Sequence, residues 1–409
     1  MKRLQVRYRG WGENWPLGEL ADDGRDLLFE YSKEALREGL DLSPLRLPLR
    51  SEAYGNFPAY MLRLPGLIAD SLPDGWGLLL MDRYLRRLGR EPAEVSPLDR
   101  LAFLGARALG ALSYEPPDAV ELTDTDLTLL RLAEDVDLVH AGRDHEVLRR
   151  LLVLGGSPHG ARPKAAVGYD PIHRSIRTVA DKDHRPYLIK FPAASEHKEV
   201  CAVELAYCET ARVCGIEVPE TRYFDLDRSH AAFGIARFDI EAGMRVPVHT
   251  LAGALHADFR TPAVDYISFL RATRAVTRDE REVANAYDRA VFNVLFNNRD
   301  DHSKNCVFRL ERDRRWRLAP AYDLTFNVGP GGEHQMDVCG EARTVTRAHM
   351  LDLAEKGGVE KRVAIASLDR MMEEIGGFAR RLQDHPIRRA TVRTITQAVK
   401  ANAKALCAN

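Results

Sequence analysis

A dense group of polar residues interrupts an otherwise apolar stretch of the sequence at residues 292–308, FNVLFNNRDDHSKNCVF. An apolar, helix-like run leads into two aspartates, a histidine, a lysine and asparagines, and the chain is apolar again directly afterwards. Because a buried charge without a partner is costly, such a group either serves chemistry or forms a solvated turn. Its members are Asp300, Asp301, His302, Lys304 and Asn305.

The spacing of Asp300 and Asn305 suggests which chemistry this is. The two residues form the pattern D-x-x-x-x-N, which in protein kinases carries the catalytic base and a metal-binding asparagine. Such a pair also occurs by chance in many loops. The other parts of a phosphoryl-transfer site must therefore be sought elsewhere in the chain.

A glycine-rich stretch, LGGSPHGARPK, precedes the strand-like segment KAAVGYD. Gly155, Gly156 and Gly160 can expose backbone N–H groups in a concave turn that suits phosphate oxygens. Gly155 and Gly160 have the spacing of a P-loop, but Ala161 and Arg162 replace its lysine and hydroxyl residue, which argues against a Walker A motif. Taken alone, the stretch is better interpreted as an ordinary glycine-rich hairpin or linker.

Lys190 stands at the end of a predicted strand, RPYLIKFP, and a predicted helix over about 196–214 follows it. A single lysine in a strand is usually solvated. The order of strand lysine and helix glutamate is nevertheless that of the kinase ion pair that anchors phosphates. Glu204 is a better partner than Glu199 because its neighbours are apolar, although a surface carboxylate is an equally good interpretation.

These parts occur in one order along the chain, and Asp323 completes them after a predicted hairpin. Each is a weak signal alone, but this order and spacing together arise far more rarely by chance. Lys190 would pair the phosphates of ATP, and Asn305 and Asp323 would hold Mg²⁺ with oxygen ligands. Asp300 would orient or deprotonate the attacking hydroxyl. The chain lacks the H-R-D, D-F-G and A-P-E motifs, and His302 gives the variant D-x-H-x-x-N, similar to aminoglycoside and phosphoinositide kinases.

Composition places these motifs in an ordinary globular protein of two or three domains. The 409 residues are 45% hydrophobic and 29% charged, with a net charge of −1, which does not indicate bulk binding of nucleic acid. No signal peptide or membrane-spanning run is evident, so we expect a cytoplasmic protein without a membrane partner. The absence of any C-x-x-C pair predicts free thiols for all six cysteines: Cys201, Cys208, Cys214, Cys306, Cys339 and Cys407.

The predicted elements give an α+β fold. Strands and helices alternate in the first hundred or so residues, and a boundary is expected near 115–126. The pattern is helical over about 127–154, strand-rich to about Asp239, and mostly helical from Asp265 onward. One early helix is expected to start near Asp74, with an apolar face formed by Leu78, Met81, Leu85 and Leu88.

Six stretches together resemble the HipA-type serine/threonine kinases, the toxins of HipBA-like toxin–antitoxin modules. They are SLPDGWGLLLMDR (71–83), GGSPHGARPKA (155–165), YLIKFP (187–192), FGIARFD (233–239), FNNRDDHSKN (296–305) and LAPAYDL (318–324). The resemblance implies a kinase-like two-lobed core, with a mixed-sheet N-lobe and an all-helical C-lobe, and an extra β-rich N-terminal subdomain. The implied division is 1–120 for this subdomain, 121–245 for the N-lobe and 246–409 for the C-lobe.

The resemblance also implies roles for individual residues. Asp300 matches the catalytic base, and Asn305 and Asp323 match the metal ligands. Ser157 falls at the serine that these kinases autophosphorylate, a modification that favours a loop ejected from the ATP site; Pro158 could restrict that movement. The implied ATP-binding residues are His159, Gly160, Ala161, Arg162, Pro163, Lys164, Lys190, Ala236, Arg237, Phe238, His302, Ser303, Lys304, Asn305, Tyr322 and Asp323.

The implied function is ATP- and Mg²⁺-dependent phosphorylation of a serine or threonine in a cytoplasmic protein. Targets known in the family include aminoacyl-tRNA synthetases, and the implied partner is a HipB-like helix-turn-helix antitoxin, with DNA bound through it. A catalytically weak co-repressor and a small-molecule kinase remain alternatives. A metal-dependent hydrolase using Asp301 and His302 is a more remote one, because no further ligands at metal-site spacing are evident.

Overall fold

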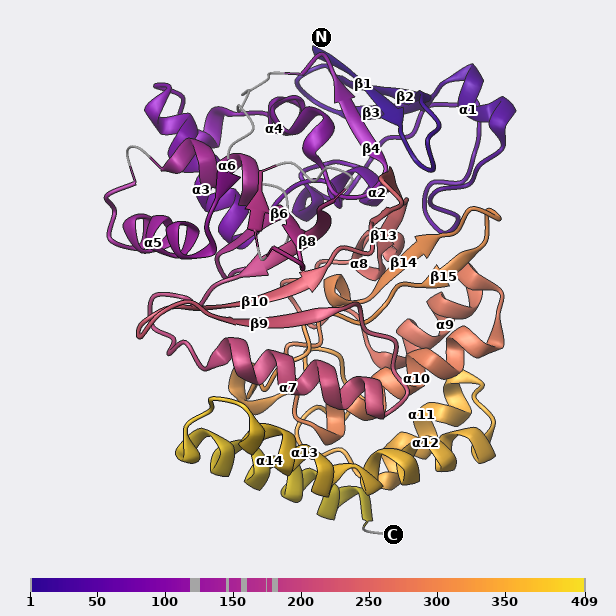
Figure 1. Cartoon of the computed structure of the whole chain (residues 1–409). Coiled ribbons are helices and arrows are strands. Elements are labelled where there is room, and N and C mark those ends of the chain that lie inside the picture. Colours follow the sequence, from indigo (N-terminus) through magenta and orange to yellow (C-terminus); the bar gives the residue numbers. More distant parts are fainter. Residues whose placement is uncertain are drawn as a thin grey trace. The chain divides into compact units, whose positions relative to one another are not determined.

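The structure is a computed structural model that describes residues 2–117, 126–144, 147–155, 160–173, 175–178 and 183–407 (Figure 1). It divides into two compact units. The first consists of Met1–Cys201 and Glu220–His249, and the second of Ala202–Pro219 and Thr250–Asn409.

The helices of the described ranges include none that is long and apolar enough to cross a membrane. All six cysteines are free thiols, as predicted.

The N-terminal part of the first unit is built on an antiparallel sheet with the strand order β3-β2-β1-β4. In β1, Leu4, Val6 and Tyr8 are buried and the residues between them are more exposed, the alternation of a strand with one face in the core. The elements are β1 Lys2–Tyr8, β2 Trp15–Asp22, β3 Leu27–Tyr31, α1 Lys33–Glu38, α2 Gly66–Ala69, α3 Gly75–Arg87, α4 Pro97–Leu104 and β4 Leu112–Glu115.

Helix α3 starts where expected, but its predicted apolar face is partly wrong. Trp76 and Leu80 are buried together with Met81 and Leu85, whereas Leu88 is exposed. Because residues 78–80 are all leucines, either of two neighbouring faces of the helix could be its buried apolar face. Burial of the large Trp76 ring decides between them, because it contributes more apolar area than one leucine.

The second sheet of this unit has six strands in the order β5-β7-β6-β8-β10-β9. All of its neighbouring strands pair antiparallel, so the mixed sheet expected for this part is not what the structure shows. The region expected to be helical over about 127–154 contains two helices, and Gly155, expected in the loop, is the last residue of the second. The elements are β5 Asp126–Leu127, α5 Leu129–His140, α6 Leu148–Gly155, β6 Lys164–Asp170, β7 Ser175–Arg177, β8 Arg185–Lys190, β9 Thr221–Asp225, β10 Ala231–Ala236, β11 Ile240–Glu241 and β12 Met244–Arg245.

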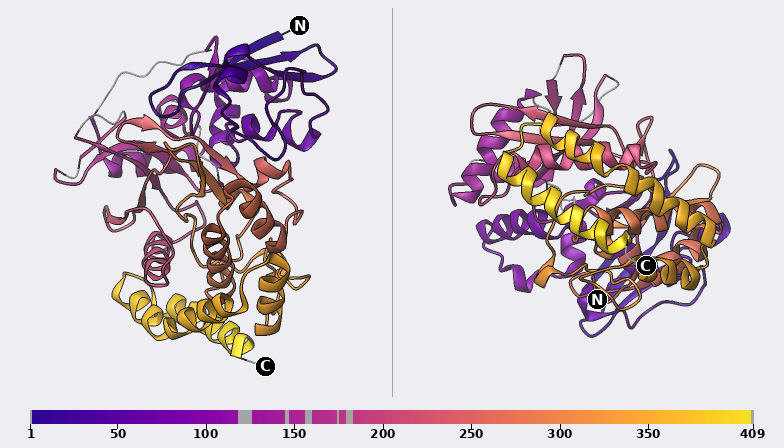
Figure 2. Two further views of the ribbon diagram at one scale, coloured as in Figure 1. Left: turned by 90° about the vertical axis from the view of Figure 1, so that its right-hand side faces the viewer. Right: turned by 90° about the horizontal axis from the view of Figure 1, so that it is seen from below.

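The second unit is mostly helical and is built around α10, which packs against α9, α12 and α14 (Figure 1). The last two helices, yellow in Figure 2, pack against each other. The predicted hairpin is confirmed as β14 and β15, which pair Phe308 with Leu318. The remaining elements are α7 Val200–Val213, β13 Val248–Thr250, α8 Leu251–Leu255, α9 Tyr266–Thr277, α10 Glu280–Leu295, β14 Val307–Leu310, β15 Trp316–Leu318, α11 Arg347–Gly357, α12 Lys361–Glu373, α13 Ile375–Asp384 and α14 Arg389–Cys407.

Candidate active site

The predicted site residues fall into two groups, one in each unit. The first unit carries the glycine-rich stretch, of which Ser157, Pro158 and His159 lie outside the described residues. Gly160 has φ +101°, and a Cβ atom on it would lie 2.4 Å from Nζ of Lys164. Only glycine combines this backbone conformation with such a close approach of the ammonium group.

Lys164 and Lys190 are both buried, with 3% and 4% of their surfaces exposed. They are opposite each other in the register of β6 and β8, and the Lys190 ammonium lies 5.7 Å from the centre of the Phe233 ring. The common expectation of a solvated strand lysine does not hold for Lys190. An ammonium group is a strongly hydrated point charge that binds phosphate oxygens well, and two of them lie opposite each other here, next to the end of the glycine-rich stretch.

The N-terminal part of the same unit holds the end of the glycine-rich stretch. The Asp74 carboxylate accepts a hydrogen bond from the backbone N–H of Gly160, and the backbone N–H of Trp76 donates to the Gly160 carbonyl at 3.1 Å. Gly75 has φ +43°, and a Cβ atom on it would lie 2.5 Å from the Gly160 carbonyl oxygen. The SLPDGWG stretch therefore positions the chain that leads into Lys164.

Replacing Gly75 by alanine is expected to destabilise the protein by about 3 kcal/mol, from a strained positive φ and from a clash with Gly160. Gly89→Ala is the matched control, because Gly89 has φ +71° but open space around its Cβ position. It should cost only the backbone strain of about 1–2 kcal/mol. Urea unfolding measures both, and equal losses would contradict the proposed contact.

The predicted ATP-binding stretch 236–238 begins at Ala236, the last residue of β10. The N–H of Ala236 donates to Glu220 and that of Arg237 to Pro186, so these two N–H groups are used within the protein. Arg237 forms a two-bond ion pair with Asp239, at 2.9 and 2.7 Å. Burial raises the pKa of Asp239, but the Arg237 guanidinium and the Gly110 N–H outweigh it and hold this pKa below its ordinary value of 3.8.

Asp239→Asn is expected to destabilise the protein by about 2–3 kcal/mol at pH 7, because it leaves the Arg237 guanidinium without a counter-charge. A carboxylate whose pKa is lower in the folded state stabilises the folded protein at pH values above its unfolded-state pKa. This stabilisation is lost as the pH falls through the folded-state pKa. The difference between wild type and variant should therefore shrink below about pH 4. Urea midpoints at pH 7 and pH 3 test this, and a constant difference would contradict it.

The second group of predicted residues follows the end of α10 in the second unit. Asn297 has φ +56°, which ends the helix and turns the chain into the loop 298–305, defined here as the catalytic loop. The Asn298 amide donates to Asn293, whose own amide donates to the Tyr266 hydroxyl. A 3₁₀ turn, Ser303–Asn305, closes the loop before β14 begins.

The two neighbouring aspartates of the catalytic loop have different surroundings. The Asp300 side chain is 45% exposed, whereas that of Asp301 is fully buried. Asp301 accepts hydrogen bonds from the Tyr266 hydroxyl at 2.7 Å, from His334 Nδ1 at 2.8 Å and from the Gln335 N–H at 2.8 Å. Asp301 is thus an internal anchor of the loop, and Asp300 is the carboxylate that a substrate can reach.

Hydrogen bonds also hold residues that were predicted to surround Asp300. Asn305 Nδ2 donates to the Asp300 carbonyl at 2.8 Å, so the Asn305 Oδ1 atom is oriented as an acceptor or metal ligand. The Tyr322 hydroxyl donates to the Lys304 carbonyl at 2.6 Å, which ties the segment carrying Asp323 to the loop. Asp323 is half-buried and has φ +55°, a strained conformation for a non-glycine residue that occurs often at functional sites.

The oxygen ligands in this group fit Mg²⁺, which takes one or two protein carboxylates and completes its shell with water and phosphate oxygens. Asn305 Oδ1 and the Asp323 carboxylate could supply such oxygen ligands. Within the described ranges, no cluster of three or more His, Cys, Asp or Glu side chains is arranged to hold a metal ion.

His302, Ser303 and Lys304 lie on the same loop. The Lys304 ammonium lies 4.2 Å from the centre of the Phe259 ring, and the His302 ring is 5.9 Å from it. Ser303 and Lys304 are buried. Phe259 therefore fixes the loop from the side, by a cation–π contact and an aromatic contact.

Sequence reasoning missed several residues that support this group. His334 and Gln335 follow the segment of Asp323, and Gln335 contacts both aspartates, since its Nε2 donates to Asp300 Oδ1 at 2.9 Å. Tyr266 is 35 positions from its partner Asp301. No spacing motif signals contacts over such distances. The family stretch SLPDGWG was the only sequence signal for the contact of Asp74 with Gly160.

Two family models match the sequence. The HipA-like C-terminal domain matches residues 156–377, and the HipA N-terminal domain matches residues 9–115. No curated protein matches it significantly.

Solved structures give two further comparisons. The HipA chain of Shewanella oneidensis MR-1, in a complex of HipA, HipB and operator DNA, is 17% identical with a TM-score of 0.74, over 98% of this chain and 97% of that chain. The Helicobacter pylori proinflammatory kinase CtkA is 13% identical with a TM-score of 0.42, over 60% of this chain and 89% of that chain, a likeness too low to carry an argument.

These matches confirm the predicted α+β fold, with its β-rich N-terminal part and its mostly helical C-terminal part. The C-terminal family model alone matches more than half of the sequence, and the N-terminal model covers most of the rest. This chain belongs to the HipA family.

Proposed function

We propose that this protein is an ATP-dependent serine/threonine kinase that acts on a cytoplasmic protein. The observation that carries the proposal is the hydrogen-bonded group in the catalytic loop. There, a half-exposed Asp300 is bonded through its carbonyl to Asn305, and Tyr322, next to Asp323, is bonded to Lys304. Family membership and the buried pair Lys164 and Lys190 support the same chemistry.

The proposed roles follow from charge and exposure. Asp300 accepts the proton of the attacking hydroxyl, because its carboxylate is the reachable one. Lys190 and Lys164 neutralise phosphate oxygens of ATP, and Asn305 and Asp323 hold Mg²⁺. When bound, the ion neutralises negative charge on the phosphates. The remaining ATP-binding residues named from the sequence stay part of this proposal.

The finer features are proposals as well. We propose Ser157 as an autophosphorylation site, a HipB-like antitoxin as the partner, DNA bound through that antitoxin, and growth inhibition as the outcome. Binding of an antitoxin is supported by the Shewanella complex, whose HipA shares this fold. An aminoacyl-tRNA synthetase is the substrate to test first. The division into 1–120, 121–245 and 246–409 remains a proposal.

The experiment that tests the function is incubation of the purified protein with [γ-³²P]ATP, Mg²⁺ and host lysate, followed by mass spectrometry of labelled proteins. Kinase activity predicts label on serine or threonine of a discrete set of proteins. Phosphopeptides of the protein itself report on Ser157. Binding of an antitoxin without any transfer of label would instead favour the catalytically weak co-repressor.

Gln335→Ala is expected to lower kcat about 10-fold and to leave the KM for ATP within about twofold, because one hydrogen bond that orients the Asp300 carboxylate is lost. Stability should change little, since the Gln335 N–H still donates to Asp301. Initial rates of label transfer measure the effect. Gln383→Ala, at an exposed position, is the control. A kcat equal to that of wild type would exclude a positioning role for Gln335.

A further inference from the structure

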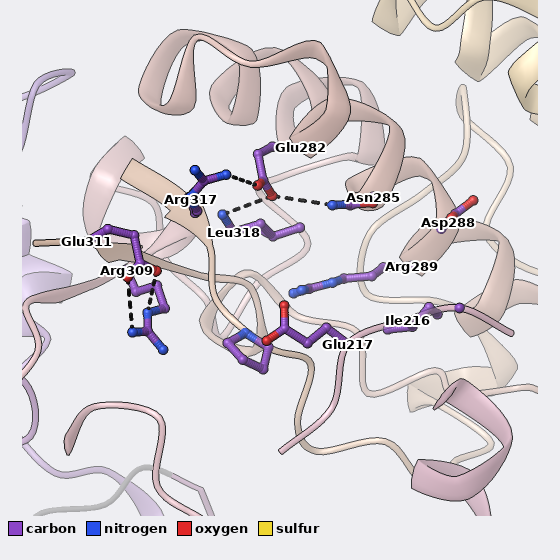
Figure 3. A pocket seen from close by; sticks show the side chains of 12 residues that line it. Ile216, Glu217, Glu282, Asn285, Asp288, Arg289, Arg309, Glu311, Arg317 and Leu318 are labelled. Atoms are coloured by element: carbon purple, nitrogen blue, oxygen red, sulfur yellow. Dashed lines mark hydrogen bonds and ion pairs between the residues drawn. The ribbon is translucent and has the colours of Figure 1, made fainter. Parts of the chain in front are cut away.

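A cavity of about 350 Å³ lies within the second unit, at a place that the proposed kinase chemistry does not use. Its wall is formed by one side of α10, by β14 and β15, and by the segment after α7 (Figure 3). Charged side chains dominate it. The lining residues are Gly215, Ile216, Glu217, Glu282, Asn285, Asp288, Arg289, Arg309, Glu311, Arg317, Leu318 and Pro320.

Three of the four carboxylates in this wall are neutralised by arginines. Glu282 accepts from the Leu318 N–H at 3.3 Å and pairs with Arg317 at 3.6 Å. Glu311 pairs with Arg309 at 2.8 Å. Asp288, also in the wall, pairs with Arg370 at 2.6 Å. These carboxylates therefore supply little net charge to the cavity.

Arg289 differs from the other arginines of the wall. Its side chain extends from α10 into the cavity, between Leu318 and Glu217 (Figure 3). One Nη atom donates to the Ala319 carbonyl, but no carboxylate of the described residues forms an ion pair with the group, and its Nε atom is buried without a hydrogen-bond partner. Burial lowers the pKa of the guanidinium, and the charges of Glu282 and Glu217, which act in the opposite direction, do not outweigh it.

We propose that this cavity binds a small anion, whose carboxylate or phosphate group is held by the Arg289 guanidinium. A guanidinium presents two parallel N–H donors to either group, which is the strongest geometry for recognising such anions. A bound anion would satisfy the buried Nε atom and give the guanidinium a counter-charge in direct contact. The cavity volume lies within the range of small-molecule sites, about 300–1,000 Å³.

Glu217 sets a second condition on the ligand. It is exposed, and its carboxylate makes no ion pair with the described residues, yet it lies close enough to Arg289 to affect its titration. A like charge at the edge of the cavity opposes an anion. Removing this charge should therefore strengthen binding, whereas a cationic ligand would be bound more weakly after the same change.

The test is thermal unfolding of the full-length protein with sodium phosphate or sodium malonate, at constant ionic strength held with sodium chloride. We expect a saturable rise in Tm with at least one probe, and the probe that acts identifies the anionic group. Arg289→Met should weaken its affinity about 10-fold or more. Arg281→Met removes the same charge from the exposed side of α10 and should leave the response unchanged.

Other outcomes would overturn the proposal. They are the absence of a saturable response to either probe, and an unchanged response in Arg289→Met, which would place the anion elsewhere in the protein. If Arg289→Met does not fold, Arg289→Lys provides the comparison, because it keeps the charge and loses the paired donors. Glu217→Gln should tighten binding of the probe at low salt, and unchanged or weaker binding would show that the anion does not bind beside Glu217, which contradicts the proposed site.

Discussion

Asp300→Asn is expected to lower the rate of phosphoryl transfer by about 100-fold or more, the usual contribution of a general base. Asparagine cannot accept the proton of the attacking hydroxyl. The Asn side chain can still accept the hydrogen bond from Gln335 Nε2, so the loop geometry is kept. The loss should therefore appear in kcat, with unfolding by urea unchanged. Transfer of label from [γ-³²P]ATP measures it.

Asp323→Asn should abolish transfer as well, because it weakens a metal ligand. Both variants should also remove growth inhibition on expression. Asp313→Asn is the charge-matched control, since Asp313 is exposed in the turn between β14 and β15. Full labelling and full growth inhibition in both active-site variants would refute the kinase proposal.

Asp301→Ala is expected to have the largest effect on stability, about 3–5 kcal/mol. The change leaves the Tyr266 hydroxyl, His334 Nδ1 and the Gln335 N–H without their buried acceptor. Each is held where water cannot readily replace the carboxylate, because Tyr266 and His334 are themselves buried. Urea unfolding at pH 7 measures the loss.

Tyr266→Phe removes one of these three donors and keeps the ring, so a smaller loss of about 1–2 kcal/mol is expected. In the double variant that combines Asp301→Ala with Tyr266→Phe, the second change should cost less than it does in the wild-type protein. The acceptor of the Tyr266 hydroxyl is already absent there. Additive losses would show that the two groups do not interact. A loss below about 1 kcal/mol for Asp301→Ala would show that Asp301 is not an anchor of the loop.

Local sequence patterns predicted much of the framework. The alternation in β1, the hairpin β14–β15 and the helical C-terminal part are local features, set by residues that are neighbours in the chain. The order of the glycine-rich stretch, Lys190, the D-x-x-x-x-N pattern and Asp323 likewise needed only the sequence. Element boundaries were less certain. Gly155 was expected in a loop and lies in α6, because a glycine can end a helix as well as follow it.

Only the tertiary structure distinguished the two adjacent aspartates by their surroundings. The spacing pattern favoured Asp300, but the burial of Asp301 depends on Tyr266, His334 and Gln335, which lie 33 to 35 positions away. The burial of Lys190 opposite Lys164 depends on how β6 and β8 pair. Hydrogen bonds and burial between distant segments arise from packing, which no local pattern encodes. The sequence therefore determined which chemical groups are present and in what order, and the fold decided which of them are anchored inside and which can meet a substrate.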